Sequence, residues 1–134
     1  MRKVVRTAEA PRAMGVYSQA IVSDGMVFVS GQGAVNPATN EMEGDDIRSQ
    51  TRRVLQNIRA ILEASGSSLQ DVVRMGVFLA DVGDFAGMNE VFREFFPDDP
   101  PARTTVGCVL PKPTMKVEID CVARVRARTA GRKR

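Results

Sequence analysis

Histidine is absent from the sequence. It is the commonest general base in enzymes, the commonest zinc ligand, and the proton carrier of the Ser-His and Cys-His mechanisms. Its absence excludes these arrangements and leaves a serine-nucleophile mechanism with little support.

Cysteine is scarce as well. The two cysteines, Cys108 and Cys121, form no Cys-x-x-Cys motif, and two thiolates cannot build a four-sulfur metal site. Both lie in apolar, strand-like runs, so we expect free, buried thiols and no metal. A phosphate-binding loop is also missing. Gly31 and Gly33 match the start of a dinucleotide fingerprint, but no third glycine follows at Asn36 and no helix is expected to begin there.

Long apolar runs are absent too. None approaches the length of a membrane span, and the charged N-terminus is not followed by the apolar core of a signal peptide. We therefore expect a cytoplasmic protein with no membrane partner. The 134 residues, 43% of them hydrophobic, fit one domain with one core. We place this domain at residues 1–126 and a basic tail at 127–134.

The net charge of +3 reflects the C-terminal end of the chain. Six of the 19 basic residues lie from Arg124 to Arg134, where there is no acid, so the preceding residues carry 13 basic against 16 acidic side chains. The body is therefore net acidic. A basic end can touch nucleic acid, but we favour a solvated, partly disordered tail and expect no nucleic-acid partner.

Hydrophobic periodicity predicts six strands and two helices in the order β-β-β-α-β-α-β-β. The strands are expected at 2–6, 20–22, 26–30, 72–79, 103–110 and 116–126, and the helices at 46–65 and between Asp84 and Pro97. Asp24-Gly25 is typical of a hairpin turn between the second and third strands. Two helices against one sheet with sequence-adjacent hairpins predict an α+β, two-layer domain.

Apolar and mostly charged residues alternate along the last predicted strand. Odd positions from Val117 to Val125 are apolar and are expected under the helices, whereas the even positions include Glu118, Asp120 and Arg124, with Val122 among them. A face of this mixed character suits an oligomer interface with polar clefts better than a plain solvent face.

Arg103 and Glu118 are the leading candidates for chemistry. Arginine presents a planar fork that holds a carboxylate with two hydrogen bonds, but Arg103 also fits a strand entry paired with a surface acid. Glu118 lies between Val117 and Ile119, where partial burial would raise its pKa toward values useful for proton transfer. An exposed strand glutamate facing a lysine or arginine is the equally good alternative.

Three further polar residues have both a functional and a structural interpretation. Tyr17, the one tyrosine, either walls a pocket or anchors its loop. Ser30 ends an apolar strand just before Gly31, where backbone N–H groups are available to an anion. Asn89 is either a satisfied helix residue or a group that reaches across an interface.

Short motifs are spread along almost the whole chain: Ala10-Pro11, Gly15-Val16-Tyr17-Ser18-Gln19-Ala20, Val29-Ser30-Gly31-Gln32, Gln50-Thr51, Asn57-Ile58, Pro101-Ala102-Arg103-Thr104 and Val117-Glu118-Ile119. In order and spacing they resemble the Rid family of reactive-intermediate imine deaminases, whose older label is endoribonuclease L-PSP. The resemblance implies a chorismate-mutase-like α+β fold and a barrel-centred homotrimer, with helices outside, sheets inside and sites in the clefts between subunits.

The resemblance also implies a reaction. Family members hydrolyse short-lived enamine and imine acids, such as 2-aminoacrylate, 2-iminopropanoate and 2-iminobutanoate, to 2-keto acids and ammonia without a cofactor. Carried over by position, Arg103 would bind the substrate carboxylate and Glu118 would orient or activate water. The other residues placed at the site are Tyr17 as a second catalytic candidate, Ser30, Gly31, Thr105, Asn89 and Phe85.

The sequence departs from the family pattern at several points. Val16 stands where proline usually precedes the tyrosine, Thr105 replaces a frequent cysteine, and the segment from Phe96 to Arg103 is short and proline-rich. These departures leave the reaction class intact and the preferred substrate open. The alternatives are a deaminase for another imino acid, such as an aminomuconate-like or aminoacrylate-peracid-like intermediate, and a non-catalytic trimer that binds a small carboxylate. A ribonuclease or translation inhibitor is disfavoured by the missing histidine and the acidic body.

Overall fold

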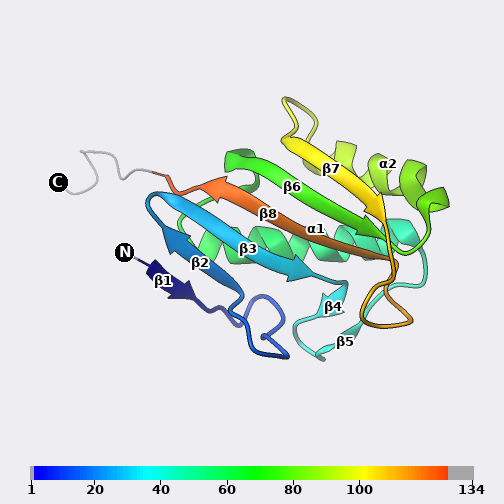
Figure 1. Cartoon of the computed structure of the whole chain (residues 1–134), viewed down its shortest axis with the longest axis horizontal. Coiled ribbons are helices and arrows are strands. Elements are labelled where there is room, and N and C mark those ends of the chain that lie inside the picture. Colours follow the sequence, from blue (N-terminus) through cyan, green and yellow to red (C-terminus); the bar gives the residue numbers. More distant parts are fainter. Residues whose placement is uncertain (1, 127–134) are drawn as a thin grey trace.

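The chain is described here by a computed structural model, which covers residues 2–126. Its main sheet has six strands in the order β1-β2-β3-β8-β6-β7, and two helices lie against one side of it (Figure 1). The strands are β1 (Arg2–Val5), β2 (Ala20–Ser23), β3 (Met26–Gln32), β6 (Val72–Leu79), β7 (Ala102–Gly107) and β8 (Val117–Arg124), and the helices are α1 (Ile47–Ala64) and α2 (Phe85–Phe95).

The strands pair antiparallel except for β6 and β7, which run parallel and are joined through α2. The β2–β3 hairpin turns at Asp24 and Gly25, whose φ angles of 50° and 79° are both positive. Two positive φ angles are characteristic of a type I′ turn, which is the turn that Asp-Gly favours. A separate two-stranded sheet pairs β4 (Val35–Asn36) with β5 (Glu41–Met42).

Helix α1 begins and ends where its sequence signals predict. The Asp46 side chain accepts a hydrogen bond from the Ser49 backbone N–H at 2.8 Å, and the Ser49 hydroxyl faces back toward the cap, so that the two form a capping box. At the other end Gly66 adopts a φ of 80°, and the Ser67 N–H bonds the Leu62 carbonyl at 2.8 Å. This is the geometry of a glycine-terminated helix.

Helix α2 follows a short 3-10 turn, Val82–Asp84. Asp84 occupies the N-cap position but makes no side-chain cap bond, and Asp81 instead accepts a bond from Gly83 at 2.8 Å. The two helices are joined on their outer surface by two exposed ion pairs, Arg48–Glu90 and Arg52–Glu94. Exposed pairs of this kind contribute about 1 kcal/mol or less each.

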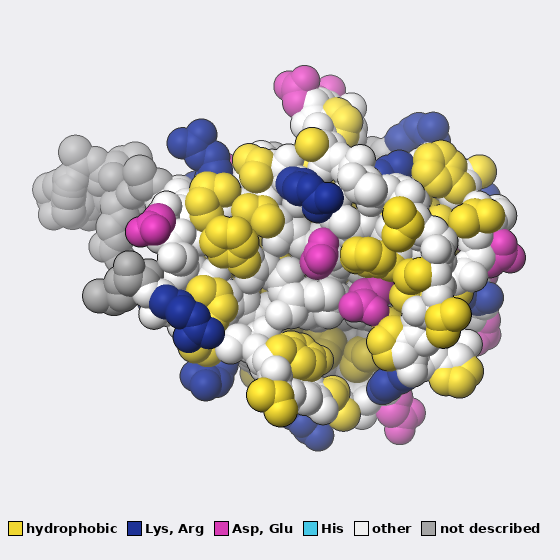
Figure 2. All heavy atoms as spheres, viewed as in Figure 1, with side chains coloured by type: hydrophobic (Ala, Val, Ile, Leu, Met, Phe, Trp, Pro, Cys, Tyr) yellow, Lys and Arg dark blue, Asp and Glu magenta, His cyan; other side chains and the backbone are white. Residues whose placement is uncertain are grey.

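The core lies between the helices and the sheet. The odd residues of β8 from Val117 to Ala123 are buried, together with the apolar face of α1. The opposite face of the sheet carries no helix, and its side chains are a mixture of apolar and charged groups (Figure 2). Phe28 and Val106 on this face are 47% and 43% exposed.

The predicted two-layer α+β architecture and its element order are confirmed, including strand 72–79 and the helix at 46–65. Two local expectations are wrong. The segment around Asn36 and Asn40, for which no strand is expected, forms the β4–β5 hairpin. The strand that begins at Ala102 ends at Gly107, so Cys108 lies beyond it and is exposed rather than buried. The expected tail at 127–134 lies outside the described residues.

None of the helices within residues 2–126 is long and apolar enough to cross a membrane.

Candidate functional site

A cavity of about 370 Å³ opens on the side of the sheet that the helices leave uncovered. Four residues expected at the site from the sequence meet there: Tyr17, Ser30, Gly31 and Glu118. They come from the loop before β2, the end of β3 and the first part of β8. The rest of the lining comprises Met14, Gly15, Gly33, Val35, Met42, Pro111, Lys112 and Met115.

A β-bulge shapes the floor of this cavity. Val29 pairs with Cys121 and Gln32 with Ile119, so that Ser30 and Gly31 together oppose the single residue Asp120. Bulges locally bend a strand and re-aim its residues, and they are common beside active sites. Here the bulge turns Gly31 toward the carboxylate of the neighbouring strand.

Glu118 lies directly against Gly31. A Cβ atom at this glycine would overlap the Glu118 carboxylate, so the missing side chain is what gives the carboxylate its place. Glu118 is half-buried, and burial together with the nearby charge of Asp120 raises its pKa above the ordinary carboxyl value. Among residues 2–126 no cation offsets this shift, which argues against an ordinary glutamate paired with a surface lysine or arginine.

Ser30 and Tyr17 are held by local hydrogen bonds. The Ser30 hydroxyl donates to the Ser18 carbonyl at 2.6 Å, and its backbone N–H donates to the Gln19 carbonyl at 3.0 Å. The Tyr17 hydroxyl accepts from the Met14 N–H at 3.2 Å, while the ring remains 50% exposed. Tyr17 therefore both anchors its loop and walls the cavity, which combines the two interpretations left open by the sequence.

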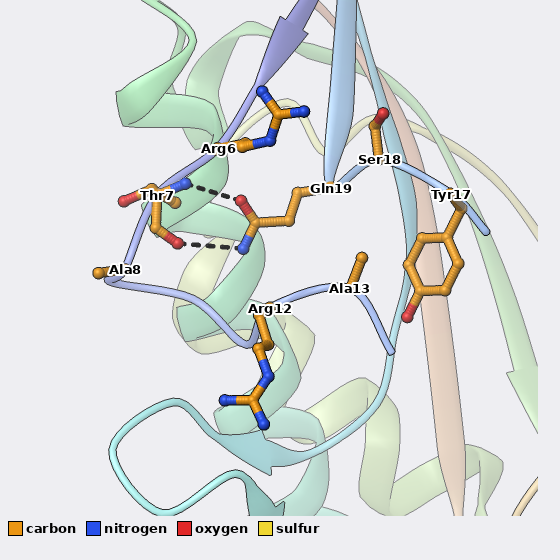
Figure 3. Close-up of a pocket in the computed structure, with 8 residues that line it drawn as sticks. All are labelled: Arg6, Thr7, Ala8, Arg12, Ala13, Tyr17, Ser18 and Gln19. Atoms are coloured by element: carbon orange, nitrogen blue, oxygen red, sulfur yellow. Dashed lines mark hydrogen bonds between the residues drawn. The ribbon is translucent and has the colours of Figure 1, made fainter. Parts of the chain in front are cut away.

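Tyr17 also borders a second cavity, of about 390 Å³, between the loop and the end of β1 (Figure 3). The buried Gln19 amide crosses its base. Its Oε1 accepts from the Thr7 N–H at 2.7 Å, and its Nε2 donates to the Thr7 and Pro11 carbonyls at 3.1 and 2.7 Å. Arg6 and Arg12 line the rim, but their guanidinium groups point in different directions in Figure 3 and do not converge on one point.

Arg103 lies elsewhere, on the side of the sheet covered by α2. Its Cζ atom is 4.8 Å from the centroid of the Phe92 ring and 5.6 Å from that of Phe85, and Nη1 is 3.7 Å from the sulfur of Met88. Partial burial lowers the pKa of Arg103, although an arginine remains charged at neutral pH. Within residues 2–126 no carboxylate forms an ion pair with it. It is thus a cation held in position by aromatic rings and left available to an anion.

The remaining predicted residues lie on the Arg103 side. Phe85 contacts the guanidinium as described, and Asn89, four residues further along α2, lies on the same stripe of the helix and is half-buried. Thr105 follows Arg103 by two residues in β7 and so faces the same side of the sheet. The Asn89 side chain makes no hydrogen bond within residues 2–126 and is partly exposed.

The predicted residues therefore form two groups. One surrounds Glu118 on the uncovered face and the other surrounds Arg103 beneath α2, and the structure of one chain does not bring them together. Sequence reasoning missed the apolar wall of the cavity, chiefly Met42 and Met115. Two features of the sequence could have indicated this wall: the high methionine count and the Pro-Lys-Pro loop shortly before the last strand.

Fold and site together define the class: a small α+β protein of the chorismate-mutase-like fold. It has a carboxylate-bearing cavity at the β3 bulge and, on the edge strand, an arginine that forms no ion pair with any residue from 2 to 126. The family profile described as Endoribonuclease L-PSP matches residues 7–125. The chain belongs to this family, which includes the Rid proteins.

Three similar proteins illustrate the match. A RutC family protein of Pyrococcus horikoshii is 47% identical over 92% of this chain and 98% of its own length. The 2-iminobutanoate/2-iminopropanoate deaminase of Dermatophagoides farinae is 39% identical over 90% of this chain and 94% of its own. The crystal structure of Escherichia coli TdcF with bound serine has a TM-score of 0.86 and 41% identity, covering 93% of this chain and 99% of that one.

Proposed function

We propose that this protein hydrolyses reactive imine and enamine acids to 2-keto acids and ammonia. The substrates we propose are 2-iminopropanoate, formed from 2-aminoacrylate, and 2-iminobutanoate. Relatives named as reactive intermediate deaminases support a deaminase role in the family.

The observation that carries the proposal is the environment of Glu118. It is a half-buried carboxylate with a raised pKa, placed against Gly31 in a cavity that a small organic acid can enter. A base whose pKa is closer to neutrality transfers protons more effectively near neutral pH.

The chemistry follows from these groups. Arg103 binds the substrate carboxylate with two parallel hydrogen bonds. Glu118 accepts a proton from a water molecule as the water oxygen bonds to the imine carbon, and the imine nitrogen takes up a proton to give a carbinolamine. The amine nitrogen then takes up a second proton, the C–N bond breaks so that ammonia leaves with the bonding electron pair, and the hydroxyl loses its proton to give the keto acid. The overall change is the addition of one water and the loss of one ammonia, so no redox partner is required. Tyr17, which lines the same cavity, is the second group that we propose to hydrogen-bond the reacting centre.

The same proposal includes assembly into a homotrimer. Arg103 and Glu118 face opposite sides of one sheet, and the uncovered face presents apolar side chains such as Phe28 and Val106. Packing the uncovered faces of three chains around a common axis buries these side chains. It also allows the Arg103 group of one chain to approach the Glu118 group of the next.

A coupled assay tests the activity. A threonine or serine dehydratase generates the imine, and release of the keto acid is followed with and without this protein. We expect the protein to accelerate release well beyond the buffer rate, and Glu118→Gln to remove most of the acceleration. Equal rates with and without the wild-type protein would sink the proposal, and binding of 2-ketobutyrate without acceleration would instead indicate a carboxylate-binding protein.

A further inference from the structure

Gln50 is a buried polar residue that the proposed mechanism does not use. It lies in the first turn of α1, on the buried side of the helix, and is 1% exposed. Glutamine is rarely buried this completely unless its amide is fully hydrogen-bonded. What the amide contacts therefore indicates what it does.

The Gln50 side chain reaches two segments of the cavity wall. Its Oε1 accepts a hydrogen bond from the Lys116 N–H at 2.8 Å, and its Nε2 donates to the Thr114 carbonyl at 2.9 Å. The same Nε2 donates to the Gly44 carbonyl at 3.1 Å. One amide thus joins the segment before β8 to the segment after β5.

The first two of these bonds fall on either side of Met115. Met115 lines the cavity and is only 8% exposed, and it packs so closely on Gly33 that a Cβ atom there would lie 2.8 Å from its terminal methyl group. Met42, which also lines the cavity, precedes Gly44 by two residues. The Gln50 amide is therefore bonded to the backbone on both sides of Met115 and to the residue two positions after Met42, which are two of the three methionines of the wall.

Glu118 follows Lys116 by two residues. It lies in strand β8, which begins directly after the segment 114–116 that Gln50 binds. The Lys116 backbone is fixed by the Gln50 bond at the point where the chain enters β8. A displacement of the Lys116 backbone would therefore move both Met115 in the cavity wall and the Glu118 carboxylate.

A second buried side-chain amide of α1, that of Asn57, binds the opposite wall of the cavity. Asn57 lies seven residues after Gln50, two helical turns along the same side, and its Nδ2 donates to the Val35 and Gly33 carbonyls at 2.8 and 3.3 Å. Both of these residues line the cavity. Helix α1 thus holds both sides of a cavity that lies on the far side of the sheet.

We propose that Gln50 is a positioning residue for the site: its amide fixes the Thr114–Lys116 segment and so sets the place of Met115 and of the Glu118 carboxylate. The catalytic consequence rests on the proposed function, but the positioning itself does not. Glutamine is required for this role because it supplies one acceptor and two donors from one planar group.

A direct titration of Glu118 separates positioning from a general contribution to stability. The titratable and charged groups that face this carboxylate are Asp120 on its own strand and Tyr17 and Lys112 from the loops. The adjacent strands place Ser30, Gly31 and Phe78 beside it, none of which titrates. A shift of the Glu118 titration in a folded variant therefore reports a change in its burial or in its position relative to these groups.

The experiment compares Gln50→Met with the control Ser67→Ala. Methionine keeps the shape of the side chain and removes all three bonds. Ser67 is also buried, and its hydroxyl donates to the Arg124 carbonyl at 2.7 Å, at the other end of the same strand β8. Glutamate side chains labelled at the carboxyl carbon are titrated by NMR, and kcat for 2-iminobutanoate is measured on the same folded preparations.

In Gln50→Met we expect the Glu118 midpoint to move down toward the ordinary carboxyl range and kcat to fall on the order of tenfold to hundredfold, as a displaced catalytic group does. Ser67→Ala should leave both unchanged. A folded Gln50→Met with the wild-type Glu118 midpoint would overturn the proposal, as would an equal shift in Ser67→Ala.

If Gln50→Met does not fold, Gln50→Glu replaces it, because it retains the acceptor for the Lys116 N–H. A wild-type protein without imine hydrolysis would defeat the proposed function only, since the titration still decides the role of Gln50.

Discussion

Arg103 and Glu118 lie on opposite faces of the same sheet, with strand β6 between them. Arg103 pairs with Met75 of β6 and points toward the rings of α2, whereas Glu118 pairs with Phe78 of β6 and faces the uncovered side. The two groups that would act on one small substrate are thus presented in different directions by one chain. We therefore propose that the site is assembled from two subunits, with each chain giving Arg103 to one site and Glu118 to another.

Mixing two impaired variants tests this arrangement. Arg103→Ala and Glu118→Gln are each expected to lose most of the activity as homo-oligomers, but a co-refolded mixture contains interfaces in which an intact Arg103 meets an intact Glu118. With random assembly from equal amounts, about a quarter of the sites are intact, so about a quarter of wild-type activity should return. A mixture as inactive as its components would show that both groups act within one chain.

The effect of Arg103 alone should be large and local. Arg103→Ala removes a charge-assisted contact to the substrate carboxylate, and such contacts contribute about 1.5–3 kcal/mol, so we expect kcat/KM to fall roughly 10- to 100-fold. Arg59→Ala is the matched control, because the Arg59 guanidinium also lies over a ring of α2, 5.5 Å from the centroid of Phe95. If the two substitutions reduce kcat/KM equally, the loss reflects ring packing and not substrate binding.

The fold was largely predictable because its signals are local. The helix from Ile47 to Ala64 has an apolar face at helical spacing, an aspartate cap and a terminal glycine. The strand from Val72 to Leu79 is apolar apart from Arg74 and Gly76. The two-residue strands β4 and β5 carry too little pattern to be detected. Cys108 was expected to be buried because the apolar run continues past Gly107, whereas the strand ends there.

The site was predictable only as a set of residue types. The side of the sheet taken by Glu118 follows from the alternation in β8, but that of Arg103 depends on its contact with Phe85 and Phe92, which lie on another element. The bulge that turns Gly31 toward Glu118 is a register shift between strands far apart in sequence. Tertiary pairings of this kind have no signature in local periodicity.

Any side chain at Gly31 should reduce the activity of the site. In Gly31→Ala the new methyl group occupies the space of the Glu118 carboxylate, which must move. We expect kcat to fall on the order of a hundredfold, as for a catalytic group displaced by about 1 Å, with the protein still folded by circular dichroism. Adding Gly31→Ala to Glu118→Gln should cost little more, because the displaced group is already inactive. Full additivity of the two losses would contradict the assigned contact.

The pH dependence of the reaction should report the environment of Glu118. The proposed base acts as a carboxylate, so kcat should fall on the acid side with a midpoint above the ordinary glutamate range, because burial and Asp120 raise the pKa of Glu118. Asp120→Asn removes the like charge and keeps the oxygen that accepts the Gly76 N–H at 3.1 Å, so the acid midpoint should move to lower pH. Glu63→Gln, which removes an exposed carboxylate of α1, should leave it in place. An acid midpoint unaffected by Asp120→Asn would assign the titration to another group.

Glu118 should also reduce the stability of the fold that contains it. Its pKa is raised in the folded state, so between the unfolded and folded pKa values the folded chain binds more protons. The free energy of unfolding therefore decreases as pH rises through this window, and the cost of the ionised carboxylate is fully present above the folded pKa. Glu118→Gln, which mimics the protonated form, should raise the urea midpoint at neutral pH and have little effect below the ordinary carboxyl range. Urea unfolding at a fixed protein concentration, at both pH values, checks this, and a destabilised Glu118→Gln at neutral pH would mean that the carboxylate is a structural group and not a strained functional one.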